Sequence, residues 1–383
     1  MLTIEETRMH LIECLNNDAV KNVLLITGKK SFFKSGAARI ISNSEKEIEV
    51  THFNEFAENP RIEDVKVGVD LYKSKKFEAI IAIGGGSVID MAKLIKYFGN
   101  TKKITVDSIL AQESSPVETL LYAIPTTAGT GSEVTHFAVV YDGIEKYSVS
   151  SNLILPTKVF LCPELLLSQT KYQKIVSGLD AICQAIESYW SINSTFESRK
   201  FSSKALELIL PNITKVTDEI DDIQIHKKLA LGAFYAGKAI NISKTTAPHA
   251  LSYYLTKKFG IPHGHAVAIF LPSFINYNFQ FNSRTLSAYN FKKESLEKIL
   301  LNNIKGSKNE RLDFLLYEFI TNLGISINPL QLGLTKDEFI SSLEHANPER
   351  MKNNPRDFKL KDYIEENIDF FKKTIYRSEH NSR

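Results

Sequence analysis

The sequence is poor in cysteine, has no long apolar run and carries almost no excess charge, and each absence argues against a class of protein. Its three cysteines, Cys14, Cys162 and Cys183, lie in no paired spacing, so a disulfide framework or a cysteine-bound zinc ion is not expected. No apolar run approaches the roughly 20 residues that cross a bilayer. A net charge of +3 over 383 residues is too small to favour nucleic-acid binding.

The N-terminal residues lack a secretory pattern. A signal peptide has a basic stretch followed by an apolar one, whereas this chain carries Glu5 and Glu6 there. We therefore expect a protein of the reducing cytoplasm, with neither a membrane nor a nucleic acid as its partner.

The order of apolar and amphipathic stretches predicts two domains. Strands are predicted at 23–27, 48–52, 79–83 and 120–124, separated by helical patterns at 65–76 and 88–98. This alternation indicates a parallel sheet covered by helices. Later helical patterns lie at 178–192, 197–215, 224–239, 247–258, 263–277, 310–323 and 336–346. We expect an α/β domain at 1–163 and an all-helical domain at 164–383.

Three glycines follow one predicted strand directly. Gly84, Gly85 and Gly86 precede Ser87 and a predicted helix that carries Asp90. Glycines there let backbone N–H groups approach an anion, and the helix N-terminus favours negative charge, as a bound pyrophosphate requires. The spacing is not the usual dinucleotide fingerprint, so a plain strand-to-helix turn is the alternative.

A second polar turn follows the next strand, after Pro125. Its hydroxyl residues are Thr126, Thr127, Thr130 and Ser132. Loops at the carboxyl ends of neighbouring parallel strands are where open α/β sheets bind ligands. We expect both loops to face one ligand.

Four residues have the spacing of a divalent-metal site: Asp180, Gln184, His249 and His263. Asp180 and Gln184 lie four residues apart in a predicted helix and so share one face. The two histidines are fourteen residues apart, which would separate them by about 21 Å on one helix. Convergence on one ion therefore requires a break between them.

Gly260 and Pro262 can supply that break, because glycine ends helices and proline suits their first turn. One carboxylate with two imidazoles suits Fe(II) or Zn(II) with an open position. The alternative is that His249 caps or packs a helix and His263 merely follows a turn.

In these motifs the chain resembles the iron-containing (group III) alcohol dehydrogenases, relatives of dehydroquinate synthase in fold. The similarity runs in order from about residue 20 to 370 and ends in Asn354-Pro355-Arg356. It implies a dinucleotide-binding α/β domain, a helical metal domain, NAD(P)H, Fe2+ or Zn2+ at the four residues above, and a homodimer. The cofactor-binding residues it implies are Gly28, Gly84, Gly85, Gly86, Ser87, Asp90, Thr126, Thr127, Thr130 and Ser132.

The chain departs from the family pattern in three places. Gln184 replaces a histidine ligand, and a neutral amide oxygen is a weaker donor, so the metal could be loosely bound, different or dispensable. Tyr253 stands where relatives often have a histidine near the substrate; its phenol or His265 is the candidate proton relay. Gly28 replaces an aspartate that would bind the ribose, and this tolerates the 2′-phosphate of NADP.

The segment before His249 is unusual for a simple alcohol enzyme. Lys238, Lys244, Thr245 and Thr246 offer the cations and hydroxyls that a tetrahedral dianion needs. The segment looks like the phosphonoacetaldehyde reductase branch of the family, which implies reduction of phosphonoacetaldehyde to 2-hydroxyethylphosphonate. Both lysines lying on the surface at a helix end is the alternative.

Three other functions remain open from the sequence. A dehydroquinate synthase-like lyase or cyclase shares fold, nucleotide loop and metal, although the second polar turn and Asn354 favour a dehydrogenase. A general short-chain alcohol dehydrogenase is disfavoured by the lysine and threonine cluster. A catalytically inactive helper is favoured only by Gln184.

Overall fold

The chain forms two compact units, each built from two stretches of sequence. The computed structural model describes residues 1–42, 48–112, 116–143, 145–218, 220–280, 287–305, 311–346 and 351–375, with the backbone alone for 287–291. Unit 1 comprises Met1–Lys174 and Ile220–Gly237, and unit 2 comprises Ile175–Glu219 and Lys238–Arg383.

Unit 1 contains a parallel five-stranded sheet in the order β2-β1-β3-β4-β7. Its strands are β1 (Asn22–Thr27), β2 (Glu49–Phe53), β3 (Ala79–Gly84), β4 (Leu120–Pro125) and β7 (Lys158–Val159). An antiparallel pair, β5 (Phe137–Asp142) and β6 (Glu145–Ser150), forms a second sheet. Strands β1, β3 and β4 are apolar at nearly every position, because both faces of this sheet are covered.

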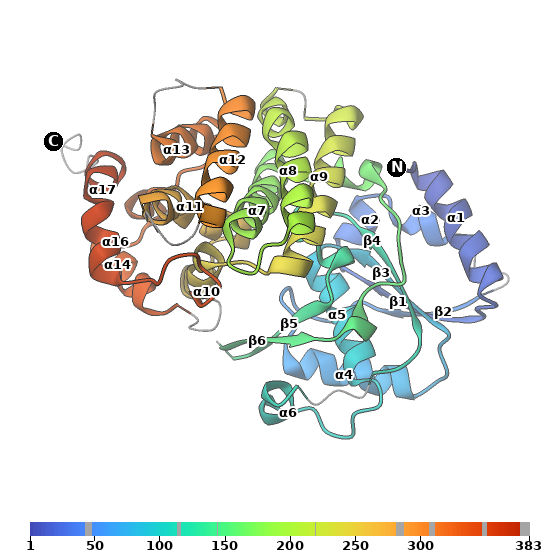
Figure 1. The fold of residues 1–383 in the computed structure, drawn as a ribbon. Helices are drawn as coiled ribbons and strands as arrows, with labels where there is room; N and C mark the ends of the chain where they lie inside the picture. Colours follow the sequence, from blue (N-terminus) through green and yellow to red (C-terminus); the bar gives the residue numbers. More distant parts are fainter. Residues whose placement is uncertain are drawn as a thin grey trace. The chain divides into compact units, whose positions relative to one another are not determined.

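Successive residues of each central strand point to opposite sides and enter separate cores. Leu24, Ile80 and Leu121 pack with α4 (Ile62–Lys73) and α5 (Gly86–Phe98) on one face. Val23 and Ile81 pack with α1 (Ile4–Asn17) and α3 (Ala38–Ile41) on the other (Figure 1). The remaining short helices of this unit are α2 (Ser31–Lys34), α6 (Val106–Leu110), η2 (Ser132–Val134), η3 (Asn152–Ile154) and η4 (Pro163–Leu166). Because the strands of this sheet are parallel, their carboxyl ends and the loops that follow them lie at one edge of the sheet.

Unit 2 is helical. Two helices, α7 (Lys171–Trp190) and α9 (Ile223–Ser243), begin in unit 1 and continue into unit 2. The others are α8 (Phe196–Ile213), η5 (Thr214–Thr217), α10 (Ala247–Phe259), α11 (His263–Gln280), α12 (Ser287–Asn303), α13 (Leu312–Asn322), η6 (Pro329–Leu332), α14 (Lys336–Glu344), α16 (Leu360–Glu366) and α17 (Ile368–Thr374). Helix α11 is apolar all round and buried along most of its length, so it forms the centre of this unit.

The predicted fold class is confirmed, with a parallel α/β part followed by a helical part. The sequence analysis did not predict the β5–β6 pair or α12; β6 and α12 are rich in polar residues, whereas β5 is largely apolar. Residue 310, predicted to start a helix, lies outside the described residues. The boundary between 163 and 164 stays a prediction.

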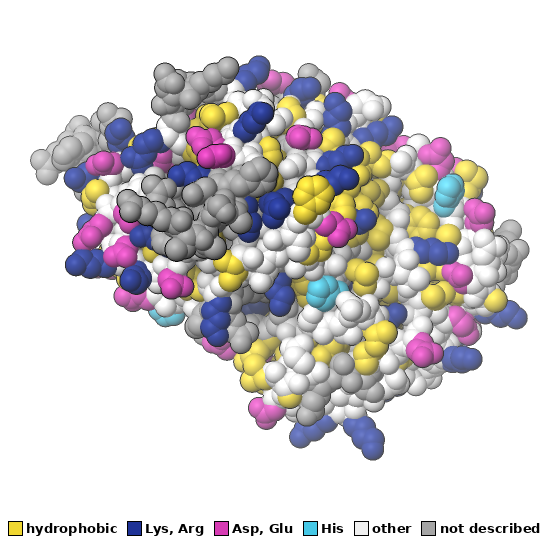
Figure 2. Space-filling model, viewed as in Figure 1, with side chains coloured by type: hydrophobic (Ala, Val, Ile, Leu, Met, Phe, Trp, Pro, Cys, Tyr) yellow, Lys and Arg dark blue, Asp and Glu magenta, His cyan; other side chains and the backbone are white. Residues whose placement is uncertain are grey.

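Figure 2 shows acidic and basic side chains spread over the face in view, without one sign dominating it. Within the described part of the chain, no helix combines the length and apolar character that crossing a membrane requires.

Candidate metal centre and ligand loops

Three of the four predicted metal ligands converge within unit 2. Asp180 lies on α7, His249 on α10 and His263 at the start of α11. One donor atom from each lies within 4.8 Å of the other two. Nε2 of His249 is 3.3 Å from Oδ1 of Asp180, and Nε2 of His263 is 3.9 Å from the same oxygen. The chemistry of this donor set suits a divalent transition ion.

The predicted break between the histidines is present. Helix α10 ends at Gly260, which takes a left-handed conformation with φ 69°, and α11 begins at His263 after Pro262. The two imidazole rings then lie 5.2 Å apart between centroids. The helix ending is a local property of the glycine and the proline, which explains why the sequence could predict it.

A second glycine lets α11 approach α7. A methyl group on Gly264 would overlap the carbonyl oxygen of Val176 and lie 2.9 Å from Cβ of Asp180. Only a residue without a side chain therefore fits between the two helices at this point. This contact places His263 beside Asp180.

We expect the Gly264→Ala substitution to weaken divalent-ion binding by about tenfold or more, because an added methyl group must push α11 away from α7. Titration of the metal-free protein with Zn2+ or Fe2+ measures the dissociation constant directly. An unchanged dissociation constant would show that the distance between His263 and Asp180 does not depend on this close contact.

Gln184 follows Asp180 by one helical turn and is buried, with 3 % of its surface exposed. Residues four apart on a helix share a face, which is the geometry that the sequence predicted for both side chains. Its part in metal binding stays a prediction.

Glu187 is a member of the site that the sequence analysis did not assign. This fully buried carboxylate contacts Nδ1 of His249 and accepts hydrogen bonds from N and Oγ1 of Thr246, at 2.7 and 2.9 Å. Burial lowers the pKa of His249, but the charge of Glu187 and the hydrogen bonds to Glu187 and Asp180 outweigh it and raise the pKa to about 9. Binding of Nδ1 leaves Nε2 as the metal-ligating nitrogen.

The two predicted proton-relay residues have different surroundings. The ring of Tyr253 stacks on His263 with centroids 5.6 Å apart and planes 12° from parallel. His265 is buried, and its Nε2 lies 2.6 Å from the carbonyl oxygen of Ser326, to which it donates. Burial lowers the pKa of His265 and so favours the neutral ring. Their part in proton transfer stays a prediction.

In unit 1 the two predicted loops pack against each other. Strand β3 ends at Gly84, and α5 begins at Gly86. A methyl group on Gly85 would lie 3.2 Å from Cγ2 of Thr127, and one on Gly86 would lie 2.8 Å from Cγ2 of Thr130. The glycines therefore allow the second loop, with its hydroxyl groups, to come close to the first.

Two charged side chains of α5, Asp90 and the buried Lys93, bind the second loop. Asp90 accepts hydrogen bonds from Oγ of Ser132 and, at 3.1 Å, from N of Val139. Nζ of Lys93 donates to Oγ of Ser132, at 3.1 Å, and to Oγ1 of Thr135, at 2.9 Å. In this structure the contact between Asp90 and Ser132 joins α5 to the second loop, and direct contact of these residues with a cofactor stays a prediction.

Lys93 makes the stability of the fold depend on pH. Burial lowers its pKa from the ordinary 10.5 to about 8, against the opposing charges of Asp90 and Glu133. Between these two pH values the Lys93 ammonium keeps its proton in the unfolded chain but has lost it in the folded chain. The free energy of unfolding therefore increases as the pH rises. Relative to a Lys93→Met variant, the wild type should gain roughly 3 kcal/mol of unfolding free energy from pH 8 to 10.5.

Denaturant unfolding across this pH range tests that prediction, with Lys76→Met as the control, since Lys76 is an exposed lysine of the same unit. A difference between wild type and Lys93→Met that does not change with pH would contradict it.

The first strand ends in the turn predicted to accept the adenosine ribose. Gly28 follows β1, and a methyl group there would overlap Oγ of Ser31. Ser87, from the glycine loop, accepts a hydrogen bond from N of Asn59 at 3.1 Å. Lys29 forms an exposed ion pair of 2.6 Å with Glu55. The turn thus carries a cation and has no carboxylate within 28–30.

The predicted substrate-binding residues differ in how far they are exposed and in the groups that they contact. Lys244 is exposed, whereas Thr245 and Thr246 are buried. Oγ1 of Thr246 accepts a hydrogen bond from Nε1 of Trp190 at 2.9 Å and donates to Glu187. Nζ of Lys238 lies 5.4 Å from the ring centroid of Phe201. Their contact with a substrate stays a prediction.

Comparison with known proteins agrees with this fold and donor set. Residues 3–163 match the iron-containing alcohol dehydrogenase family, and residues 174–367 match the C-terminal part of the Fe-containing alcohol dehydrogenase family. The chain therefore belongs to the iron-containing alcohol dehydrogenase family, a family of oxidoreductases. A solved iron-containing alcohol dehydrogenase from Thermotoga maritima superimposes with a TM-score of 0.79 and 26% identity, covering 97% of this chain and 95% of that chain.

Two similar relatives carry more specific names. Phosphonoacetaldehyde reductase of Streptomyces viridochromogenes is 34% identical over 210 residues, which are 52% of this chain and 53% of that enzyme. The match thus spans about half the length of that relative. 4-Hydroxybutyrate dehydrogenase of Clostridium kluyveri is 31% identical over 301 residues, covering 76% of this chain and 78% of that enzyme.

Proposed function

We propose that the protein reduces a small anionic aldehyde to a primary alcohol with NAD(P)H, and that phosphonoacetaldehyde, giving 2-hydroxyethylphosphonate, is its substrate. The observation that carries the reductase activity is the convergence of Asp180, His249 and His263, in a chain of this family. The names of the two relatives above support the anionic group, since one denotes a phosphonate and the other a carboxylate.

The donor set fits the iron that gives the family its name. Asp180, His249 and His263 would hold the ion, with Gln184 assisting, and Zn2+ suits the same donors. When bound there, the ion supplies Lewis acidity toward a carbonyl oxygen. Glu187 fixes the orientation and tautomer of His249, which the site requires before any ion is bound.

The loops of unit 1 fit a dinucleotide. The N-terminus of α5, with Gly84, Gly85 and Gly86, can receive the pyrophosphate through backbone N–H groups. At the turn of Gly28, the absence of a carboxylate tolerates the 2′-phosphate of NADPH. Measured kcat/KM values for NADPH and NADH test this preference, and equal values would count against it.

The reaction moves two electrons and two hydrogens. A reduced nicotinamide bound at these loops would supply the hydride for the aldehyde carbon, and Tyr253, His265 or water would give the proton to the carbonyl oxygen. Lys244 and Lys238, with the hydroxyl of Thr245, orient the anionic group, whereas the hydroxyl of Thr246 already donates to Glu187. Binding energy from this non-reacting group positions the aldehyde for hydride transfer.

The test is an aldehyde panel followed by absorbance at 340 nm, together with metal analysis of the purified protein. We expect oxidation of NAD(P)H with phosphonoacetaldehyde at a higher kcat/KM than with acetaldehyde or propanal. A preference for the neutral aldehydes would favour a general short-chain alcohol dehydrogenase. No net absorbance change with any aldehyde would overturn the reductase and favour a cyclase or an inactive helper. A homodimer and a cytoplasmic location stay predictions.

A further inference from the structure

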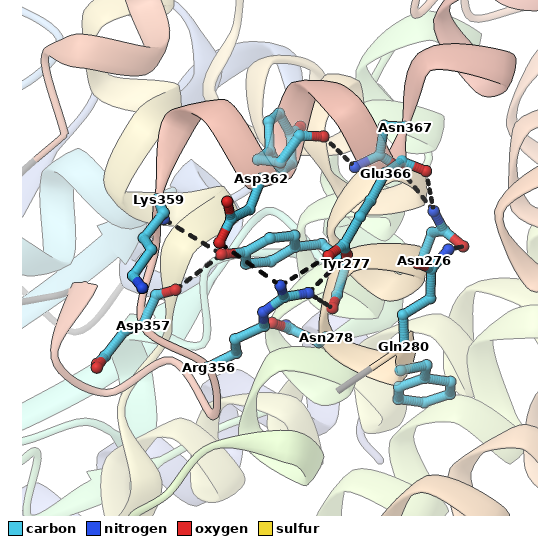
Figure 3. A network of polar contacts seen from close by, with 12 residues as sticks. Asn276, Tyr277, Asn278, Gln280, Arg356, Asp357, Lys359, Asp362, Glu366 and Asn367 are labelled. Carbon is cyan, nitrogen blue, oxygen red and sulfur yellow. Dashed lines mark hydrogen bonds and ion pairs between the residues drawn. The ribbon is translucent and has the colours of Figure 1, made fainter. Parts of the chain in front are cut away.

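The chain segment at residues 353–359 is bound to α11 by polar and ring contacts (Figure 3). The guanidinium of Arg356 lies 3.9 Å from the ring centroid of Tyr277 and forms a two-pronged ion pair with Glu366, at 2.6 and 2.7 Å. The side-chain amides of Asn354 and Asn278 exchange two hydrogen bonds, of 2.8 and 3.2 Å. Bidentate charged pairs and buried amide pairs hold a fixed geometry, so this segment is a rigid platform.

Asn353, the first residue of the platform, reaches a turn more than a hundred residues earlier. Its Nδ2 donates to the carbonyl oxygens of Ser243 and Thr245, at 2.8 and 2.9 Å. Its Oδ1 accepts from Oγ of Ser191 at 2.8 Å. The side chain is buried, and both of its donor hydrogens are used on the turn 243–246.

The two carbonyl groups that Asn353 binds flank Lys244, which has an unfavourable backbone conformation. Its φ of 59° lies in the left-handed region, where glycine is the usual residue after a helix. Its N–H donates to the carbonyl oxygen of Ile240 at 2.8 Å, and its own carbonyl oxygen accepts from Oγ of Ser243 at 3.0 Å. The Lys244 side chain is exposed, and a non-glycine residue keeps this backbone conformation only where the surrounding structure holds it.

The other end of the turn is bound to the metal centre. Thr246 donates from both N and Oγ1 to Glu187, the carboxylate that contacts Nδ1 of His249. The carboxylate of Glu187 therefore connects the turn 243–246 to His249, a predicted metal ligand. In the proposed function the aldehyde lies at that centre, and Lys244 on this turn is the cation that meets its anionic group.

We propose that Asn353 is a positioning residue for substrate selection: it holds the turn 243–246 in the left-handed conformation that presents Lys244 to the anionic group of the aldehyde. This inference rests on the proposed function. It assigns part of the substrate specificity to a residue that lies more than a hundred positions from Lys244 and has no substrate contact of its own.

The test compares Asn353→Ala, Lys244→Ala and the double variant in the full-length, metal-loaded protein. Asn353→Ala is expected to raise KM for phosphonoacetaldehyde by about tenfold while changing kcat/KM for propanal far less, since a charge-assisted contact is lost. In the double variant the loss should be no larger than in Lys244→Ala alone, because both changes remove one interaction. Equal losses with both aldehydes, or additive losses in the double variant, would overturn the inference.

Two milder variants keep the test valid if Asn353→Ala does not fold. Ser191→Ala removes one hydrogen bond to Asn353 and should raise KM for phosphonoacetaldehyde in the same direction by a smaller factor; an unchanged KM argues against the inference. Lys244→Gly should raise the melting temperature by about 1–4 °C through relief of the left-handed backbone, while losing the discrimination. A lower melting temperature would contradict a left-handed backbone at Lys244.

The two proposals fail in distinguishable ways. If wild-type protein shows no preference for phosphonoacetaldehyde over propanal, the proposed substrate is wrong. If the wild type shows that preference and Asn353→Ala retains it, only the role of Asn353 is wrong.

Discussion

Replacing His263 by alanine should remove bound metal from the purified protein and lower kcat/KM for every aldehyde by at least about a thousandfold. His263 supplies one of the three converging donors, and the remaining carboxylate and imidazole do not retain a transition ion well. Loss of Lewis acidity worth several kcal/mol corresponds to a rate effect of this size. Metal analysis and steady-state kinetics measure the two consequences separately.

His10→Ala is the matched control, because His10 is an exposed histidine on α1 with no predicted role. It should retain both metal and activity. A His263→Ala protein that keeps its activity without metal would remove the ion from the mechanism, and one that keeps its metal would remove His263 from the ligand set.

Replacing Lys244 by alanine should lower kcat/KM for phosphonoacetaldehyde by about 10- to 100-fold and affect propanal far less. A hydrogen bond to a charged group contributes about 1.5–3 kcal/mol, and only the anionic substrate can make it. Alanine, like lysine, carries a Cβ atom and meets the same steric cost in the left-handed conformation of this position. The change therefore tests the ammonium group and not the conformation of the turn. Kinetics with both aldehydes, at matched ionic strength, provide the measurement.

Two further variants define the origin of that effect. Lys244→Arg retains the charge and should recover part of the discrimination, whereas Lys200→Ala, at an exposed lysine of α8, should change neither substrate. Equal losses of kcat/KM for phosphonoacetaldehyde and propanal in Lys244→Ala would exclude an anion pocket at this residue.

The local rules of the chain were enough to predict the fold class, and three of the residues that they singled out, Asp180, His249 and His263, converge in the structure. Apolar runs that end at a turn residue such as Gly28, Gly84 or Pro125 predicted the strands and the loops at their carboxyl ends, because strand and turn preferences act within a few residues. Gly260 and Pro262 predicted the break between His249 and His263 for the same reason. The similarity to a known family added the order of the motifs along the chain.

Only the tertiary structure decided how these pieces are held in place. Gly264 against Val176, Glu187 against His249 and Asn353 against the turn 243–246 join residues that are far apart in sequence. Each contact depends on how the helices pack, and a hydrophobic pattern predicts which face of a helix is buried but not which side chain it meets. The sequence by itself therefore determined the types and spacing of the candidate ligands, whereas packing between distant segments decided their orientation and the conformation of Lys244.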